Sequence, residues 1–237
     1  MSEWKAKRFW KQADVVAEEG GYAVQLDGRS IKTPAKRALV MPTQAMAEAV
    51  AAEWQAQDEI IDPGAMPCTR TVNAAIDKVA TQHAEVADMI ADYGDSDLLC
   101  YRADAPAALI AREAAAWDPM LDWAADVLEA RLFPRTGVIH QPQDEMALLA
   151  LSRRTHDLTA FELAAFHDLV SLTGSLVLGF AAALDARPAD ALWEISRIDE
   201  IWQAEQWGRD TAAEEAAALK RASFLHAKSM FDLCGPN

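Results

Sequence analysis

The chain has 237 residues, of which 51% are hydrophobic, and its formal net charge is −15 at pH 7. This hydrophobic content is typical of a globular protein. So acidic a surface repels phosphate backbones and anionic lipids, which argues against nucleic-acid and membrane-surface partners. The charge favours a basic or apolar protein partner, or serves solubility alone.

The cysteines and the apolar segments exclude several other classes of protein. Cys68, Cys100 and Cys234 form no CxxC pair, so neither a disulfide framework nor a cysteine zinc site is predicted, and a reducing compartment is the natural environment. The first ten residues lack the apolar core of a secretory signal. The longest apolar run, residues 176–184, is well short of the roughly twenty residues that cross a bilayer, so we expect no membrane insertion.

Residues 8–41 have the pattern of short strands. The segment DVVAE precedes Gly20 and Gly21, the segment YAVQL alternates, and Asp27-Gly28 is a strong signal for a hairpin turn. The segment ALVM is the candidate for a short fourth strand. Because a meander this small is only marginally stable alone, we expect it to pack on the residues that follow.

From Pro42 onward the pattern is helical. Thr43 can cap the first helix, a break is expected at residues 61–67, and a later helix is expected to break at Pro119. One long helix is predicted from Thr159 to residue 184, because Thr159 and Glu162 have capping-box spacing. The sequence therefore predicts an α+β fold, with a small N-terminal antiparallel β domain, residues 1–42, and a larger α-helical domain, residues 43–237.

No arrangement of residues carries catalytic or metal chemistry. The five histidines form no HxxxH or HExxH pair. The glycines at the hairpins do not form a phosphate-binding loop, since no helix follows them, and no GxSxG nucleophile motif is present. We therefore predict no catalytic residues, no cofactor and no metal, and a protein that is not an enzyme.

The segment SRIDEIWQAEQWG, residues 196–208, is predicted to lie in a helix that follows Pro188 and ends at Gly208. At about 100° per residue, Trp207 falls beside Glu200 and Gln203 on the side away from the core. Either a second layer of the same protein covers this tryptophan, or another protein does. The arc that is expected to face the core is formed by Ile195, Ile198, Ile201 and Trp202.

Six segments resemble, in this order, the assembly chaperones for the α subunit of the catalytic sector of ATP synthase. The most specific are LDGRSIKTPAK, within the predicted hairpin region, and SRIDEIWQAEQWG. The matching segments are RFWKQADVV, GYAVQLDGRSIKTPAK, AVAAEWQAQ, MPCTRTVNAAID, WDPMLDW and SRIDEIWQAEQWG.

The resemblance implies a non-catalytic protein with a small β part and a larger helical part. Members of this family bind the newly made α subunit, shield its exposed surface from aggregation and release it when the β subunit arrives. An acidic residue in the last segment is important in the family, and either Asp199 or Glu200 is its counterpart here. The expected partner-binding residues are Asp199, Glu200, Gln203 and Trp207.

The organisation of the chain adds two expectations and leaves two other classes of function open. A monomer is expected, because the negative charge opposes self-association. The chain starts almost directly at the matching region, so we expect a bacterial, cytoplasmic member, whereas eukaryotic members work in the mitochondrial matrix. The alternatives are a small-molecule enzyme with a site between the β and helical domains, and a constitutive subunit of a complex.

Overall fold

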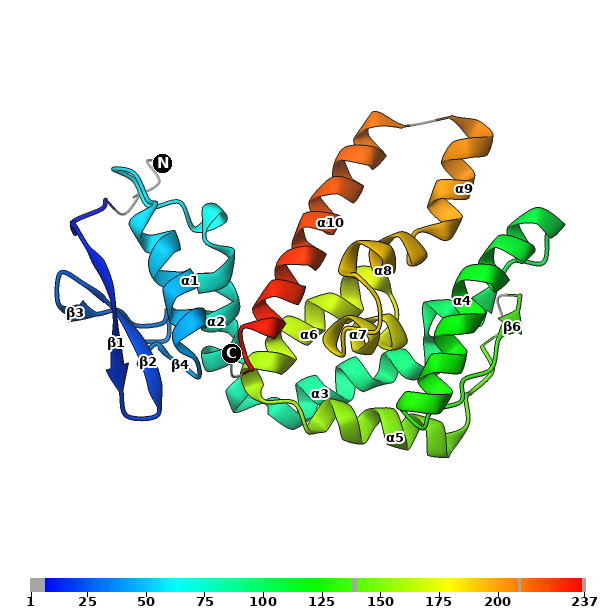
Figure 1. The fold of residues 1–237 in the computed structure, drawn as a ribbon, viewed down its shortest axis with the longest axis horizontal. Coiled ribbons are helices and arrows are strands. Elements are labelled where there is room, and N and C mark those ends of the chain that lie inside the picture. The colour runs from blue at the N-terminus through cyan, green and yellow to red at the C-terminus, as the bar shows by residue number, and fades with distance from the viewer. Residues whose placement is uncertain (1–6, 138–139, 209, 236–237) are drawn as a thin grey trace. The chain divides into compact units, whose positions relative to one another are not determined.

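The computed structural model describes residues 7–137, 140–208 and 210–235 (Figure 1). Contacts within the chain divide it into two units. A small antiparallel sheet near the N-terminus is followed by helices, which confirms the predicted fold class. The predicted domain boundary after residue 42 marks the point where strands give way to helices. That residues 1–42 and 43–237 are separate domains stays a prediction. The first unit comprises Met1–His83, Thr159–Ala165 and Ser229–Asn237, and the second comprises Ala84–Leu158 and Phe166–Lys228.

The sheet of the first unit is organised around strand β2 (Gly21–Leu26). Strand β1 (Ala13–Glu18) pairs with the whole length of β2. Strands β3 (Arg29–Ser30) and β4 (Val40–Met41) pair with different parts of β2 and share its other edge. The turn between β2 and β3 places Asp27 at φ 47° and Gly28 at φ 79°, as a tight hairpin requires, so the predicted hairpin and the short fourth strand are confirmed.

Two helices pack with this sheet, α1 (Gln44–Gln55) and α2 (Pro67–Asp77). The hydroxyl of Thr43 accepts a hydrogen bond from the backbone N–H of Met46 at 3.2 Å, so the predicted cap is confirmed. The carboxylate of Glu53 on α1 accepts bonds from the backbone N–H groups of Cys68 and Thr69, at 2.5 and 2.7 Å. A side chain of α1 thus satisfies the exposed donors at the start of α2. Short 3₁₀ turns flank α2 at Pro63–Ala65 and Val79–Thr81.

The loop that follows β3 carries the second half of LDGRSIKTPAK, one of the two most specific motifs, and its contacts are structural. The hydroxyl of Thr33 donates to Oδ1 of Asp77 at 2.7 Å, and the backbone N–H of Ala35 donates to Oδ2 at 3.0 Å. The guanidinium of Arg37 donates to the carbonyl of Ile76 at 2.8 Å, near the end of α2, where helix carbonyls lack internal partners. The loop is therefore anchored to the C-terminal end of α2.

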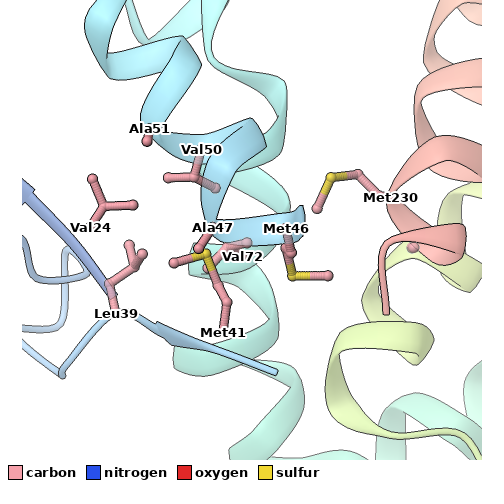
Figure 2. Packing of buried hydrophobic residues seen from close by; sticks show 10 residues of the cluster. Val24, Leu39, Met41, Met46, Ala47, Val50, Ala51, Val72 and Met230 are labelled. Atoms are coloured by element: carbon pink, nitrogen blue, oxygen red, sulfur yellow. The ribbon is translucent and has the colours of Figure 1, made fainter. Parts of the chain in front are cut away.

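The core of the first unit lies between the sheet and α1, and residues from the end of the chain complete it. Figure 2 shows Met230 close to Met46, with Leu39 and Met41 on the sheet side. The hydroxyl of Thr43 donates to the carbonyl of Leu233 at 2.5 Å. The cluster is formed by Val24, Leu39, Met41, Met46, Ala47, Val50, Ala51, Val72, Ala165 and Met230.

The second unit is built around helix α7 (Leu176–Ala183), which is buried from Leu176 to Ala182. Its first turn is held by Asp97, a fully buried carboxylate that accepts a bond from the backbone N–H of Val177 at 3.0 Å. Three of the remaining helices, α3 (His83–Ala91), α6 (Ala160–Thr173) and α10 (Thr211–Asp232), have residues in both units. The other elements of the second unit are 3₁₀ turns at Asp92–Ser96 and Leu98–Cys100, β5 (Tyr101–Arg102), α4 (Ala107–Val127), β6 (Arg135–Thr136), α5 (Glu145–His156), α8 (Ala189–Ile195) and α9 (Ile198–Trp207).

The predicted break at Pro119 is wrong, because α4 continues through this residue to Val127. The neighbouring Trp117 and Met120 are completely buried, so tertiary packing outweighs the hydrogen bond that proline cannot make. The indole N–H of Trp117 donates to the carbonyl of Ile195 at 2.8 Å, which ties α4 to the end of α8.

The long helix predicted from Thr159 to residue 184 is two helices. Its capping box is confirmed, since the N–H of Thr159 donates to Glu162 at 2.7 Å and the N–H of Glu162 donates to Thr159 at 3.3 Å. The helix stops at Gly174, which adopts φ 71°, a left-handed conformation that ends helices. Ser175 then caps α7 by accepting from the N–H of Leu178 at 3.0 Å.

Candidate functional site

The segment that was predicted to be one helix up to Gly208 is broken in the middle. The hydroxyl of Ser196 donates to the carbonyl of Trp193 at 2.7 Å at the end of α8, and α9 starts two residues later. At its other end α9 stops before Gly208, whose φ of 94° fits the predicted terminating glycine. The break gives α9 a direction of its own (Figure 1).

The helical phase of α9 separates the predicted site residues into two groups. Ile195 and Ile198 are buried, as the predicted arc requires, but Ile201 and Trp202 are only half-buried. Glu200, Gln203 and Trp207 are exposed, and Trp207 keeps 80% of its side-chain surface accessible. Within the residues that the structure describes, no second layer covers this tryptophan, so it does not act as internal packing. Asp199 is half-buried and lies on another side of the helix.

A groove of about 620 Å³ lies between α9 and α10, and residues at the end of α8 also line it. Three of the four predicted residues, Glu200, Gln203 and Trp207, line it, and Asp199 does not. The remaining lining residues are Trp193, Glu194, Arg197, Ile201, Ala204, Glu205, Gly208, Asp210, Ala213, Glu214 and Ala217.

Arg197 is the basic residue of the described lining, and it is already engaged. Its guanidinium lies 2.6 Å from the carboxylate of Glu200 and 5.6 Å from the ring centre of Trp193. Outside the groove, Arg112 of α4 lies 2.6 Å from Glu205, and this contact lowers the pKa of the Glu205 carboxyl. The groove therefore combines an apolar interior with an excess of carboxylates.

Asp199 lies against Glu113, a residue that the sequence did not single out. Glu113 belongs to α4 and is only 1% exposed, and its carboxylate accepts a bond from the backbone N–H of Ala103 at 3.0 Å. Burial raises the pKa of Glu113, and the adjacent carboxyl of Asp199 raises it further. Oδ1 of Asp199 is buried and has no hydrogen-bond partner among the described residues. A single glutamate in an alanine-rich helix gives no signal of such a pairing.

The other titratable groups do not form a reactive site. Burial raises the pKa of the Cys68, Cys100 and Cys234 thiols to about 12, so they are inert thiols at neutral pH. In the described ranges no three His, Cys, Asp or Glu side chains are placed to hold a metal ion. None of the groove residues named above is a histidine or a cysteine.

In the described parts of the chain, residues 7–137, 140–208 and 210–235, every helix is too short or too polar to pass through a bilayer.

Comparison with known proteins identifies the family. Residues 7–125 match the family described as ATP12 chaperone protein. The chain is 23% identical to the mitochondrial protein atp12 of Schizosaccharomyces pombe in an alignment 221 residues long that covers 88% of this chain and 76% of the relative.

Solved structures give the same answer. The crystal structure of Atp12 from Paracoccus denitrificans is 50% identical and superposes with a TM-score of 0.95 over 98% of this chain and 100% of that one. A point mutant of the Paracoccus protein matches with the same identity and TM-score over 99% and 100%. A protein from Agrobacterium tumefaciens is 41% identical, with a TM-score of 0.92 over 97% and 86%.

The names of these relatives agree with the prediction that the chain is not an enzyme. Its motifs, its sequence relatives and its fold lead to one assignment: the chain belongs to the ATP12 chaperone protein family, the ATP synthase assembly chaperones that its sequence resembles.

Proposed function

We propose that this chaperone binds the unassembled α subunit of the ATP synthase catalytic sector, keeps it from aggregating and hands it on for assembly with the β subunit. The observation that carries the proposal is the exposure of Trp207, 80% of whose surface is accessible at the edge of an acidic groove. Tryptophan is among the residues that most often anchor protein interfaces. An exposed one in a strongly charged protein therefore points to a partner.

The proposed contact residues have different tasks. Trp207 supplies apolar area, while Glu200 and Gln203 supply polar groups at the rim, where charges favour the correct partner more than they increase affinity. Asp199 remains in the proposed site but acts indirectly, because it lies beside Glu113 and helps to set how α9 rests on α4. The arrangement suits a chaperone, because an interface of modest size permits release.

We further propose that the protein works as a monomer in a bacterial cytoplasm. The charge of −15 opposes self-association at low salt. The location is supported by similarity, since the relatives from Paracoccus denitrificans and Agrobacterium tumefaciens are 50% and 41% identical, whereas the mitochondrial relative is 23% identical. Sedimentation at low micromolar concentration tests the first part, and a stable dimer would contradict it.

The test of the function is co-expression with the α subunit, followed by affinity capture and a light-scattering assay of α-subunit aggregation. Wild type is expected to capture the α subunit and to suppress scattering. Trp207→Ala should weaken both effects without lowering the melting temperature. The matched control is Leu219→Ala, which removes another exposed side chain, 72% accessible, from α10 outside the groove.

Failure of the wild type to capture the α subunit would contradict the proposal. Equal capture by the Trp207→Ala variant would place the contact elsewhere on the molecule.

A further inference from the structure

The two walls of the groove differ in the size of their side chains. The α9 wall presents Ile201 and Trp207, while the facing α10 wall presents Ala213 and Ala217. The lining also includes Trp193, which is only 5% exposed. Because the alanines are small, the apolar surface of α9 has no large apolar residue opposite it. The groove therefore has space for an apolar side chain from outside.

Carboxylates line the same groove as these apolar residues. Five of them line the groove, together with one guanidinium: the residues are Glu194, Glu200, Glu205, Asp210, Glu214 and Arg197. The side chain of Glu194 is exposed, and its carboxylate has no hydrogen-bond or ion-pair partner within the part of the chain that the structure describes. An anionic rim of this kind repels acidic and phosphorylated ligands and attracts cations next to an apolar group.

A polypeptide segment can supply both an apolar side chain for the groove and a cation for its carboxylates. Apolar grooves between helices commonly receive an amphipathic segment of a partner protein, and lysine and arginine place a charge at the end of an apolar stem. A small metabolite would need convergent polar groups of more than one kind to fix its orientation, whereas the charged residues of the described lining are, apart from Arg197, all acidic.

We infer that the groove between α9 and α10 binds a basic amphipathic segment of the client, with an apolar side chain seated between Ile201 and the α10 alanines and a lysine or arginine against the carboxylate rim. The inference deepens the proposed function and rests on it, because it names the kind of client segment that is bound. It also assigns a wall of the site to α10, which the sequence did not predict.

The first test uses three fluorescent helical peptides of equal length and the intact protein. In the first peptide Leu recurs at i, i+3, i+4 and i+7, so that it forms one face of the helix, and Lys occupies the other face. The second peptide has Glu in place of each Lys, and the third has Ser in place of each Leu. Anisotropy should show saturable binding of the Leu/Lys peptide alone, weakening as salt is added, because rim charges are screened. Equal binding of the Leu/Glu peptide would overturn the charge selection, and equal binding of the Ser/Lys peptide would overturn the apolar seat.

The second test fills the groove and uses neighbouring residues of α10 as controls. Ala213→Phe places a ring in the groove, whereas Ala212→Phe places the same ring on an exposed position outside it. Both residues lie in the first turn, where their N–H groups are bonded to Asp210. We expect Ala213→Phe to weaken binding of the Leu/Lys peptide by about tenfold or more, and Ala212→Phe to leave it unchanged.

The third test reverses charge in the same paired way. Glu214→Lys introduces a cation into the rim, and Glu215→Lys introduces it one residue away, outside the lining. Glu214→Lys should weaken binding of the Leu/Lys peptide more than Glu215→Lys does. Equal effects within either pair of variants would show that the groove is not the binding site.

The same variants separate this inference from the proposed function. If wild type and Ala213→Phe capture the α subunit equally well, the groove is not the client site, although the chaperone function stands. If the Leu/Lys peptide binds in the groove while wild type fails to capture the α subunit, the groove is a peptide site and the proposed client is wrong.

Discussion

At the scale of single residues, the buried carboxylate of Asp97 has the clearest role. It accepts hydrogen bonds from the backbone N–H groups of Leu99 and Val177, both at 3.0 Å. Burial raises the pKa of Asp97 from 3.8 to about 6, although these hydrogen bonds act in the opposite direction. One side chain therefore joins the 3₁₀ turn after it to the first turn of α7.

The pKa of Asp97 leads to a prediction about pH. Its folded-state value lies above the ordinary one, so the folded protein binds this proton more tightly, and its contribution to stability falls as pH rises from about 4 to about 6. Asp97→Asn removes this dependence and turns an amide toward backbone donors, which should lower stability by on the order of 2 kcal/mol. Urea unfolding at about pH 4.5 and about pH 7.5 should show the larger loss at the lower pH, and an equal loss would contradict the assignment.

The second residue-scale prediction concerns the facing carboxyl groups of Asp199 and Glu113. Because the pKa of Glu113 is raised, its contribution to stability also falls as pH rises through its folded-state value. Asp199→Asn replaces a repelling group with one that can donate to Glu113. We expect stability above neutral pH to rise by about 1 kcal/mol, since a hydrogen bond to a charged group is stabilising, and the decline with pH to become smaller.

The control for this change is Glu200→Gln, at the exposed neighbouring position, which should alter stability by less than about 0.5 kcal/mol. If Asp199→Asn destabilises the protein at neutral pH, Asp199 contributes through some contact other than Glu113.

At the scale of elements, local signals identified the strands and most helix ends. The hairpin at Asp27-Gly28, the cap at Thr43 and the capping box at Thr159 were predicted because each depends on residues next to one another in sequence. The breaks at Gly174 and Ser196 were missed because the apolar pattern continues across them. The position of Pro119 inside α4 depends on burial of its neighbours, which the sequence does not display.

Only the part of the candidate site that lies on α9 could be predicted from the sequence. The phase of α9 places Trp207 beside Glu200 and Gln203, away from the buried Ile198, in agreement with the observed exposure. The wall formed by α10 depends on how two helices diverge after Gly208. The pairing of Asp199 with α4 likewise depends on a residue 86 positions away, Glu113.

The close approach of α6 and α7 gives an element-scale prediction. A Cβ atom on Gly179 would lie 2.5 Å from Cγ2 of Val170. Gly179→Ala should therefore destabilise the protein by about 1–3 kcal/mol through overpacking, although alanine favours helix. Thermal and urea unfolding measure the loss.

Val170→Ala supplies the test of that cause. If the contact is responsible, the double variant should be more stable than the sum of the single effects predicts. Additive effects would indicate that the strain lies elsewhere.

At the scale of the whole molecule, the first unit depends on residues far along the chain. Met230 is buried in the same cluster as the sheet and α1 (Figure 2). Met230→Ala should destabilise the protein by about 2–5 kcal/mol, as is typical when a large core side chain is removed. Hydrogen exchange should become faster in β1 and β2, although the mutation lies more than two hundred residues beyond them.

Leu219→Ala is the matched control, because Leu219 lies on the same helix and is exposed. It should leave stability and exchange almost unchanged. Exchange in the sheet that is unaffected by Met230→Ala would show that the sheet and α1 are stable without this residue.

The position of Met230 also bears on how the chain folds as it is synthesised. The sheet, α1 and α2 emerge from the ribosome early, and domains generally fold in the order in which they emerge. Here the cluster around Met46 keeps an open apolar edge until Met230 has been made, and Thr43 lacks the carbonyl of Leu233 as an acceptor until three residues later. The nascent first unit therefore exposes an apolar edge, and with it a route to aggregation, throughout the synthesis of the residues between Met46 and Met230.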